Sequence, residues 1–332
     1  MMRYFIAKVG MLTLGMVLVI GLGAPFSSQA QIKSIKVSFP SATDVDDLPV
    51  ILGLQILKRN TGIDFKVVPF NTSEQAVVAV VDRAVQIGVT STPFFTAVEA
   101  GAPIKAFLQA TGPGWNLVAK SAIATIQDLK GMTFGSHSPT SFTQALIDKF
   151  VIKDKGVKPK IVFIAGSEVR AQAMLHGRLD ATMLDLANTK VVLDAAPGKF
   201  NVLVAFSAQP MIQNVFFARA DFIEKNPKLI QQFIKAELQA FRRSTADPSL
   251  WVEEGAKYVP EFKPEDILAT AKLSAQFNIY PANGGIIEKA RGTLEFHRDA
   301  GNVKDLDVDR FFVFKPLKKV LSEIGRIEIK TE

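Results

Sequence analysis

A run of hydrogen-bonding side chains follows a short apolar segment near the middle of the chain. Residues 132–135 are apolar enough for a buried strand. The run after them, at the start of a predicted helix, comprises Ser136, His137, Ser138, Thr140 and Ser141. A helix start leaves backbone N–H groups unpaired and carries the positive end of the helix dipole, so it can bind an anion. Ser138 or Thr140 could instead only cap the helix. Because five such groups exceed what one cap requires, we expect this loop to face a ligand.

Two other groups of small polar residues follow predicted strands. The first comprises Ser41 and Thr43, and the second comprises Thr90, Ser91 and Thr92. In parallel sheets, ligands gather at the carboxyl ends of the strands, so both groups are expected to face one cleft with the run after residue 135. Helix capping is again the alternative for each group.

Four further residues are candidates for the same cleft. Trp115 and Asn116 follow a Gly-Pro-Gly turn, where Trp115 could stack on a ligand or only cover a hinge. Phe142 is expected to cover the apolar part of a ligand together with Trp115. Asp185 follows a predicted strand and could bond a ligand or lock a turn. By contrast, Glu168 and Arg170 begin another helix and are expected on a solvated surface.

The residues that could support catalysis or bind a metal are few. The chain has no cysteine, which excludes disulfides, thiolate metal ligands and cysteine nucleophiles. His137, His176 and His297 belong to different predicted elements without metal-ligand spacing. Neither a Gly-x-Ser-x-Gly elbow nor a phosphate loop occurs. His137 could act as a base beside Ser136, but a polar contact or a surface position is favoured. We therefore predict a binding protein with no catalytic residue, metal or cofactor.

The N-terminus has the pattern of an export signal. Arg3 and Lys8 precede an apolar run over residues 9–26, and Ser28 and Ala30 supply the small residues that a signal peptidase requires. A signal peptide over residues 1–30 is predicted, with an uncleaved membrane anchor as the alternative. An exported, cysteine-free chain of 332 residues suits a bacterial periplasm. Its net charge of +7 is scattered rather than gathered in a basic arm, so no nucleic-acid partner is implied.

Short apolar strands alternate with helices along the first two thirds of the chain. Strands are predicted at residues 35–39, 65–69, 86–89 and 104–108, with helices at 48–58, 71–84 and 94–100 between them. The 71–84 helix is predicted to have Asn71 as its N-cap. The pattern restarts around residues 132–135, with more strands at 160–164, 181–184 and 202–206 and a helix at 168–176. The C-terminal third is helical. This alternation predicts an α/β fold of two lobes, each with a mostly parallel sheet flanked by helices.

Lobe boundaries follow from where the pattern restarts. We expect residues 31–114 and 213–332 to form the first lobe and residues 115–212 to form the second, inserted one. The connecting strands are placed near Trp115 and Asn214.

Four segments together resemble a known family. They are residues 86–93 with 100–105, residues 126–135, residues 173–181 and residues 220–227. The chain resembles the periplasmic solute-binding proteins of ABC importers, in the branch for sulfonates, taurine, nitrate and thiamine-precursor pyrimidines. The resemblance implies a type II-like two-lobed fold that closes on a small organic anion, with an ABC permease of the inner membrane as partner. A monomer is expected, and the family position of Asp185 favours ligand contact.

The chain departs from the family pattern after the strand at residues 181–184. Sulfonate and nitrate members commonly have a Trp, an acid and a Pro there, whereas this chain has Leu184, Asp185 and Leu186. The departure argues against a simple aliphatic sulfonate or nitrate ligand. An enzyme of related fold, as in thiamine-pyrimidine synthesis, and a ligand-sensing domain are the alternative functions.

Overall fold

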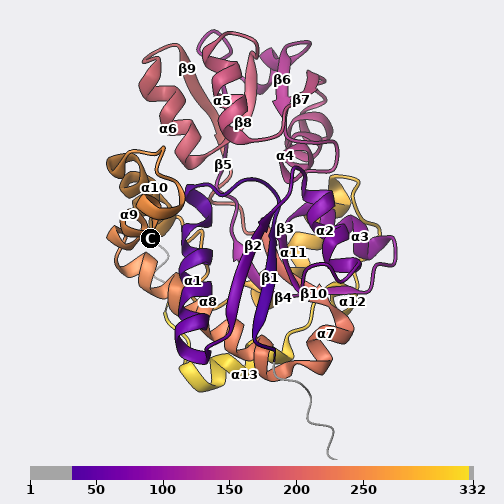
Figure 1. Ribbon diagram of the computed structural model, residues 1–332. Coiled ribbons are helices and arrows are strands. Elements are labelled where there is room, and N and C mark those ends of the chain that lie inside the picture. Colours follow the sequence, from indigo (N-terminus) through magenta and orange to yellow (C-terminus); the bar gives the residue numbers. More distant parts are fainter. Residues whose placement is uncertain (1–31, 329–332) are drawn as a thin grey trace, which may run out of the picture. The chain divides into compact units, whose positions relative to one another are not determined.

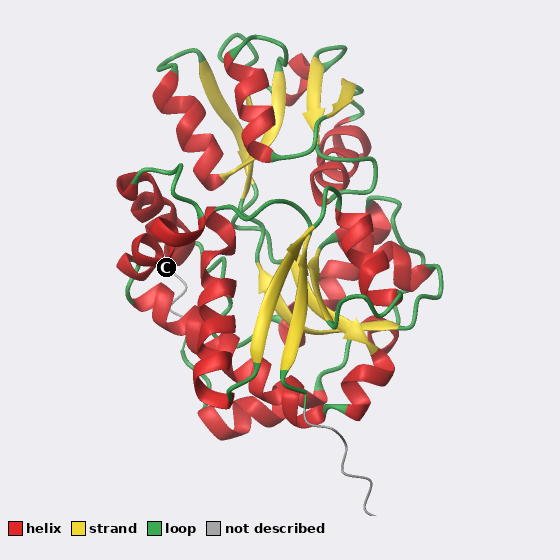
Figure 2. Cartoon of the chain, in the orientation of Figure 1, coloured by secondary structure: helices red, strands yellow, loops and turns green. Residues whose placement is uncertain are grey.

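The strands of the described residues, 32–328, form two five-stranded sheets in the computed structural model (Figures 1 and 2). The first sheet has the strand order β2-β1-β3-β10-β4, and the second has the order β7-β6-β8-β5-β9. The first contains β1 (Ser34–Phe39), β2 (Asp64–Pro69), β3 (Ile87–Thr90), β4 (Ile104–Thr111) and β10 (Asn214–Arg219). The second contains β5 (Trp115–Lys120), β6 (Thr133–Ser136), β7 (Lys160–Phe163), β8 (Ala181–Asp185) and β9 (Phe200–Ala205). The predicted signal peptide, residues 1–30, lies outside the described residues.

Each sheet combines parallel and antiparallel pairs. Strand β1 pairs in parallel with β2 and β3, and β6 pairs in parallel with β7 and β8. Strand β10 runs antiparallel to β3 and β4, and β5 runs antiparallel to β8 and β9. The predicted two-lobed α/β fold is confirmed, but its sheets are mixed rather than mostly parallel.

Strands β5 and β10, which run antiparallel to their neighbours, are the first strands that the chain forms after it crosses from one sheet to the other. The chain leaves the first sheet after Thr111 and begins β5 at Trp115. It leaves the second sheet after Ala205 and begins β10 at Asn214. Residue Asn214, the start of β10, pairs with Thr111, the end of β4. Both entering strands therefore start at the edge where their neighbours end. The lobe boundaries at residues 114/115 and 212/213 remain a prediction.

Helices flank both sheets. Around the first sheet the helices are α1 (Leu48–Thr61), α2 (Ser73–Val81), α3 (Thr92–Glu99), α7 (Ala220–Lys225), α8 (Pro227–Ala246), α9 (Ser249–Tyr258), α10 (Pro264–Gln276), α11 (Ile286–Asp299), α12 (Val308–Phe311) and α13 (Lys315–Ile324). The second sheet is flanked by α4 (Phe142–Leu146), which continues as a π-helical turn (Ile147–Lys153), by α5 (Ser167–Leu175) and by α6 (Leu186–Ala195). Helix α1 is buried along most of its length and packs on α8, as its apolar sequence predicts.

Two local predictions about helices were wrong. Thr72, not Asn71, caps α2, because the Thr72 hydroxyl accepts a hydrogen bond from the backbone N–H of Gln75 at 3.3 Å. Helix α6 was not predicted at all. It begins directly after β8 with Asp185 as its N-cap, so no turn residues mark the passage from strand to helix.

Close packing between neighbouring strands of the first sheet depends on Gly88. A Cβ atom added to Gly88 of β3 would lie 2.2 Å from the ring of Phe217 on β10. Phe217 is fully buried and packs on Phe94 of α3, with 5.3 Å between ring centroids.

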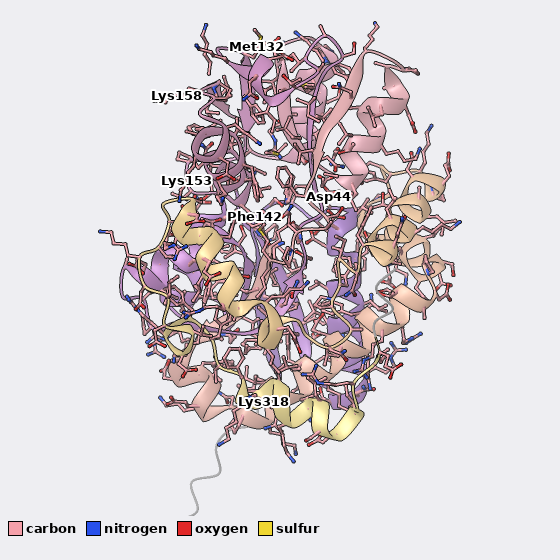
Figure 3. All side chains as sticks on the ribbon, turned by 180° about the vertical axis from the view of Figure 1, so that it is seen from behind. Asp44, Met132, Phe142, Lys153, Lys158 and Lys318 are labelled. Carbon is pink, nitrogen blue, oxygen red and sulfur yellow. The ribbon has the colours of Figure 1, made fainter. Side chains whose placement is uncertain are left out.

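Figure 3 shows Asp44 and Phe142 at the level between the two sheets, with Met132 and Lys318 at opposite ends. None of the helices between residues 32 and 328 combines the length and hydropathy that a bilayer crossing requires.

Candidate functional site

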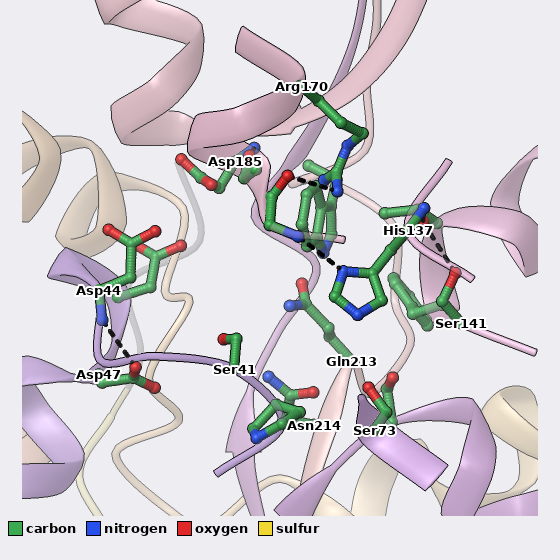
Figure 4. A pocket seen from close by; sticks show the side chains of 18 of the residues that line it. Ser41, Asp44, Asp47, Ser73, His137, Ser141, Arg170, Asp185, Gln213 and Asn214 are labelled. Carbon is green, nitrogen blue, oxygen red and sulfur yellow. Dashed lines mark hydrogen bonds between the residues drawn. The ribbon is translucent and has the colours of Figure 1, made fainter. Parts of the chain in front are cut away.

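A pocket lies where the ends of strands from both sheets meet (Figure 4). Its walls come from the loop after β1, the starts of α2 and α3, the start of β5, the loop after β6, the start of α5, the end of β8 and the segment before β10. The cavity volume is about 120 Å³. On this measure one water needs roughly 10–15 Å³, so the cavity accommodates a solute of about ten non-hydrogen atoms.

Several residues proposed from the sequence line this pocket. They are Ser41, Ser91, Trp115, His137, Ser141, Phe142 and Asp185. They come from both lobes: His137 and Ser141 belong to the loop after β6, and Phe142 begins α4. The structure thus brings together side chains that are far apart in the sequence.

Other proposed residues do not line the pocket. They are Thr43, Thr90, Thr92, Asn116, Ser136, Ser138 and Thr140. The Ser136 hydroxyl lies 3.2 Å from the Thr143 hydroxyl, and the Asn116 amide donates to the Thr189 hydroxyl at 3.2 Å. These two polar groups are satisfied inside the second lobe.

Ser138 and Thr140 bind an anion supplied by the chain itself. Both hydroxyls donate to the Oε1 atom of Glu74 on α2, the Ser138 bond being 3.0 Å long. Burial opposes ionisation of the Glu74 carboxyl, but these and neighbouring hydrogen bonds outweigh it and lower its pKa. The loop after β6 therefore contacts the first lobe through Glu74.

Arg170 lies in the wall of the pocket, not on a solvated surface, so the prediction for this residue was wrong. Its side chain is fully buried. The Nε and Nη1 atoms donate to the backbone carbonyls of Met183, Ile164 and Gly166 at 2.9–3.1 Å, whereas Nη2 has no hydrogen-bond partner among residues 32–328. Burial lowers the pKa of Arg170 to about 10, against the attraction of Asp185, so the guanidinium remains charged at neutral pH. Glu168, two residues earlier, is exposed as expected, although it also lines the pocket.

Two other nitrogen atoms of the pocket are buried without a partner. The Nδ1 atom of His137 accepts a hydrogen bond from the backbone N–H of Gly166 at 3.3 Å. Burial, followed by the nearby charge of Arg170, lowers the pKa of His137 to about 4, so the ring is neutral and its proton is on Nε2. That Nε2 atom and the Nε1 atom of Trp115 find no acceptor in the part of the chain that the structure describes. Arg170 also lies over the Trp115 ring, 5.7 Å from its centroid.

Aspartates form the opposite wall. Asp44, Asp46 and Asp47 belong to the loop and short 3-10 turn between β1 and α1, and all three are half-buried. Burial and then repulsion from Asp185 raise the pKa of Asp44 and of Asp46 well above the usual range. Burial raises the pKa of Asp47 to about 7. Figure 4 shows Asp44 and Asp47 on one side of the pocket and His137 with Ser141 on the other.

Asp185 closes the acidic wall from the second lobe. Its carboxylate caps α6, accepting from the backbone N–H of Asn188 at 2.7 Å and from the Asn188 amide at 2.9 and 3.1 Å. The side chain is nonetheless a lining residue of the pocket. Both roles proposed for Asp185, in a turn and at the site, are thus compatible with its position.

A second, larger hollow lacks the features of a binding site. It has a volume of about 920 Å³ and lies along α5, α6 and the start of α10. Its lining residues include none of the buried unpaired polar groups found in the described part of the chain. The smaller pocket is therefore the candidate site.

The sequence contained signals for the residues that were missed. Three aspartates within four residues, Asp44, Asp46 and Asp47, directly precede a buried helix, which is an unusual place for so much charge. Arg170 occupies the fourth position of α5, and its burial depends on tertiary neighbours that periodicity does not reveal. Gln213 and Asn214, which also line the pocket, lie at the predicted connection between the lobes.

Comparisons with known proteins agree with this architecture. The family model described as NMT1/THI5 like matches residues 59–250. The taurine-binding periplasmic protein of Escherichia coli (strain K12) is 25% identical over 250 residues, which is 74% of each chain. The name of this relative describes a periplasmic binding protein.

Solved structures with the same fold cover most of the chain. The periplasmic aliphatic sulphonate binding protein SsuA from Escherichia coli has a TM-score of 0.66 at 16% identity, over 84% of this chain and 97% of that one. The periplasmic nitrate-binding protein NrtA from Synechocystis PCC 6803 has a TM-score of 0.73 at 11% identity, over 89% and 90%. Since the match to the family model covers more than half of this chain, the chain belongs to the NMT1/THI5-like family.

Proposed function

We propose that this protein is the periplasmic solute-binding component of an ABC importer and that it captures a small organic molecule with an anionic group. The observation that carries the proposal is the set of three buried N–H donors without acceptors, on Trp115, His137 and Arg170, in one pocket. Leaving a buried donor unpaired costs roughly 1–3 kcal/mol, so three in one cavity favour a ligand that supplies acceptors. A carboxylate, sulfonate or phosphonate offers such acceptors, and the charge of Arg170 strengthens each bond.

The arrangement of the pocket explains how the ligand could hold the lobes together. Trp115, His137 and Arg170 belong to the second lobe, whereas Ser41 and Ser91 belong to the first. A ligand in contact with both walls interacts fully only when the lobes are close, so it shifts the population toward the closed arrangement.

The relatives' names support this function, since they describe binding proteins for taurine, sulphonate and nitrate. An inner-membrane permease as partner, a monomeric state and export through residues 1–30 belong to the same proposal.

Binding without turnover is also part of the proposal. The Nδ1 atom of His137 accepts a hydrogen bond from Gly166, and the Ser136 hydroxyl pairs with Thr143. His137 is therefore not arranged as a base toward Ser136. Recovery of the bound compound unchanged after long incubation, measured by mass spectrometry, checks this point. Conversion of a bound compound by the pure protein would contradict it.

The test of the proposal removes one unpaired donor and keeps an aromatic ring at the same position. A thermal-shift screen over sulfonates, carboxylates and pyrimidines first identifies a binder, whose affinity is measured by calorimetry. Trp115→Phe should weaken that affinity roughly ten- to a hundredfold, since a hydrogen bond to a charged group contributes about 1.5–3 kcal/mol. Any fall in the melting temperature without ligand should come from the smaller ring, because the Trp115 N–H has no hydrogen-bond partner to lose among the described residues.

A matched control is available in the same chain. The Trp251 N–H is also buried without a partner, but the ring packs against Tyr280 away from the pocket. Trp251→Phe should leave the affinity unchanged. Equal effects of the two substitutions on affinity, or no effect of Trp115→Phe, would contradict the proposed role of the pocket.

A further inference from the structure

We propose that the ligand also carries a cationic amino or amidinium group and that this group lies against the acidic wall formed by Asp44, Asp46, Asp47 and Asp185. The inference rests on the proposed function, because it identifies the chemical group at the other end of the same ligand. A zwitterion with its anionic end at Arg170 matches both walls of the pocket.

The charges that face the pocket are unbalanced. Carboxyl groups come from three elements: Asp44, Asp46 and Asp47 from the loop after β1, Asp185 from β8, and Glu168 from α5. Among the described residues that line the pocket, Arg170 is the only cationic group, since His137 is neutral. Among residues 32–328, no lysine, arginine or histidine nitrogen lies within 4.0 Å of a carboxylate oxygen of the four aspartates. A ligand with negative charge only would be attracted at one wall and repelled at the other.

The loop aspartates keep acceptor atoms free for a ligand. One oxygen of Asp44 accepts from the backbone N–H of Val45 at 2.6 Å, and one oxygen of Asp47 accepts from the backbone N–H of Asp44 at 3.0 Å. The second of these bonds belongs to the capping box of the short 3-10 turn, in which the Asp44 side chain also accepts from the backbone N–H of Asp47. The Asp46 carboxylate has no such structural bond, and the hydroxyl of Tyr280 reaches only the backbone carbonyl of Asp46. Caps alone therefore do not account for three carboxyl groups here.

A second observation at the same pocket points independently to a ligand. Arg170 is fully buried, it lines the cavity, and its Nη2 atom is unpaired. Figure 4 shows its guanidinium pointing into the space between His137 and Asp185. A metal ion is a poorer occupant than an organic cation, because the described residues contain no group of three or more side chains arranged to hold a metal.

Repulsion among the aspartates makes binding of a cation dependent on pH. Without a ligand, burial and mutual repulsion raise the pKa of Asp44 and Asp46, and burial raises that of Asp47 to about 7. Asp47 is then partly protonated near neutral pH, while Arg170 stays charged, His137 stays neutral, and burial raises the pKa of Tyr280 so that its hydroxyl stays neutral. A bound cation favours the ionised carboxylates, so protons leave as it binds. Affinity for a cationic ligand should consequently fall as the pH drops below 7, by up to about tenfold per pH unit.

The experiment compares probes that differ only in the amino group. The pairs are 2-aminoethanesulfonate with ethanesulfonate and 3-aminopropanoate with propanoate, titrated into the protein by calorimetry between pH 5 and 8. We expect the amino member to bind at least tenfold more tightly at pH 8 and to lose this advantage toward pH 5. Titrations in buffers of different ionisation enthalpy should show proton release for the amino member and none for its partner.

Two variants localise the effect. Asp46→Asn should reduce the preference for the amino member about tenfold, and it removes no structural hydrogen bond of the side chain. Asp82→Asn, an exposed residue at the end of α2, should leave the preference unchanged.

The possible outcomes separate the two proposals. Equal or tighter binding of the members without an amino group, or an unchanged preference in Asp46→Asn, would overturn this inference and leave the proposed function standing. Binding of calcium with the affinity of the amino compounds would overturn it as well. Failure of all four compounds to bind would overturn this inference, and the absence of any binder in the thermal-shift screen as well would overturn the proposed function.

Discussion

The hydrogen bonds between Glu74 and the loop after β6 provide a contact whose loss should be measurable. Glu74 lies at the start of α2 in the first lobe, and Ser138 and Thr140 lie in the second. Both hydroxyls donate to the same carboxylate oxygen. Since the contact joins the lobes beside the pocket, we predict that it stabilises the closed arrangement and slows ligand release.

The expected size of the effect follows from the exposure of the carboxylate. A hydrogen bond to a charged group contributes about 1.5–3 kcal/mol when buried. Glu74 is only half-buried, so solvent screening reduces the two bonds together to roughly 1–2 kcal/mol. That range corresponds to about five- to thirtyfold in the dissociation rate. Glu74→Gln keeps the length of the side chain and removes the charge, so it should show most of this effect.

The assay is stopped-flow dissociation of the bound compound, followed through tryptophan fluorescence. A double-mutant cycle with Ser138→Ala should give a coupling free energy of about 1 kcal/mol, which a role of Ser138 as a simple helix cap would not produce. Glu99→Gln is the control, because the Glu99 carboxylate accepts from the backbone N–H groups of Lys304 and Asp305 within the first lobe. An unchanged dissociation rate in Glu74→Gln, or an equal change in Glu99→Gln, would refute the reasoning.

Two further predictions concern stability without ligand. Burial raises the pKa of Asp47 to about 7, so its contribution to stability is present below its unfolded pKa of about 4 and is lost as the pH rises through 7. Asp47→Asn should therefore reduce the fall in melting temperature between pH 5 and 8, and an unchanged pH dependence would contradict the prediction. Gly88→Ala should lower the unfolding free energy by about 1–3 kcal/mol, because the new methyl group would meet the ring of Phe217. Gly292→Ala in α11, where the nearest atom lies 3.8 Å away, should be neutral or stabilising by up to about 1 kcal/mol in chemical denaturation, and equal losses in both glycine variants would show that the clash is not the cause.

The sequence predicted most strands and helices of the first lobe, because their apolar periodicity and turn residues are local properties. Strand β1 and helix α1 are examples, with bounds within a few residues of those expected. The direction of β5 and β10 was missed, since strand pairing depends on where the chain crosses between the sheets. Helix α6 was missed because the sequence passes from apolar strand to apolar helix through Asp185 without a break.

The candidate site was predicted only in part, for a related reason. Small polar residues after strands indicated the correct edge of the sheets, and Ser41, Ser91 and Ser141 do line the pocket. Whether a hydroxyl meets a ligand or another part of the chain depends on the opposite lobe, as the partner of Ser138 shows. The burial of Arg170 likewise follows from packing of β8 against α5, which no local pattern reveals.

The central claim is that one pocket holds a small molecule between Arg170 and the acidic wall. The most direct measurement is a crystal structure of the protein with the tightest-binding compound of the panel. We expect the anionic group within hydrogen-bond distance of the Arg170 Nη2, Trp115 Nε1 and His137 Nε2 atoms, and an amino group against the carboxylate of Asp46. A ligand bound outside this pocket, or bound in it with its anionic group turned away from Arg170, would contradict the account.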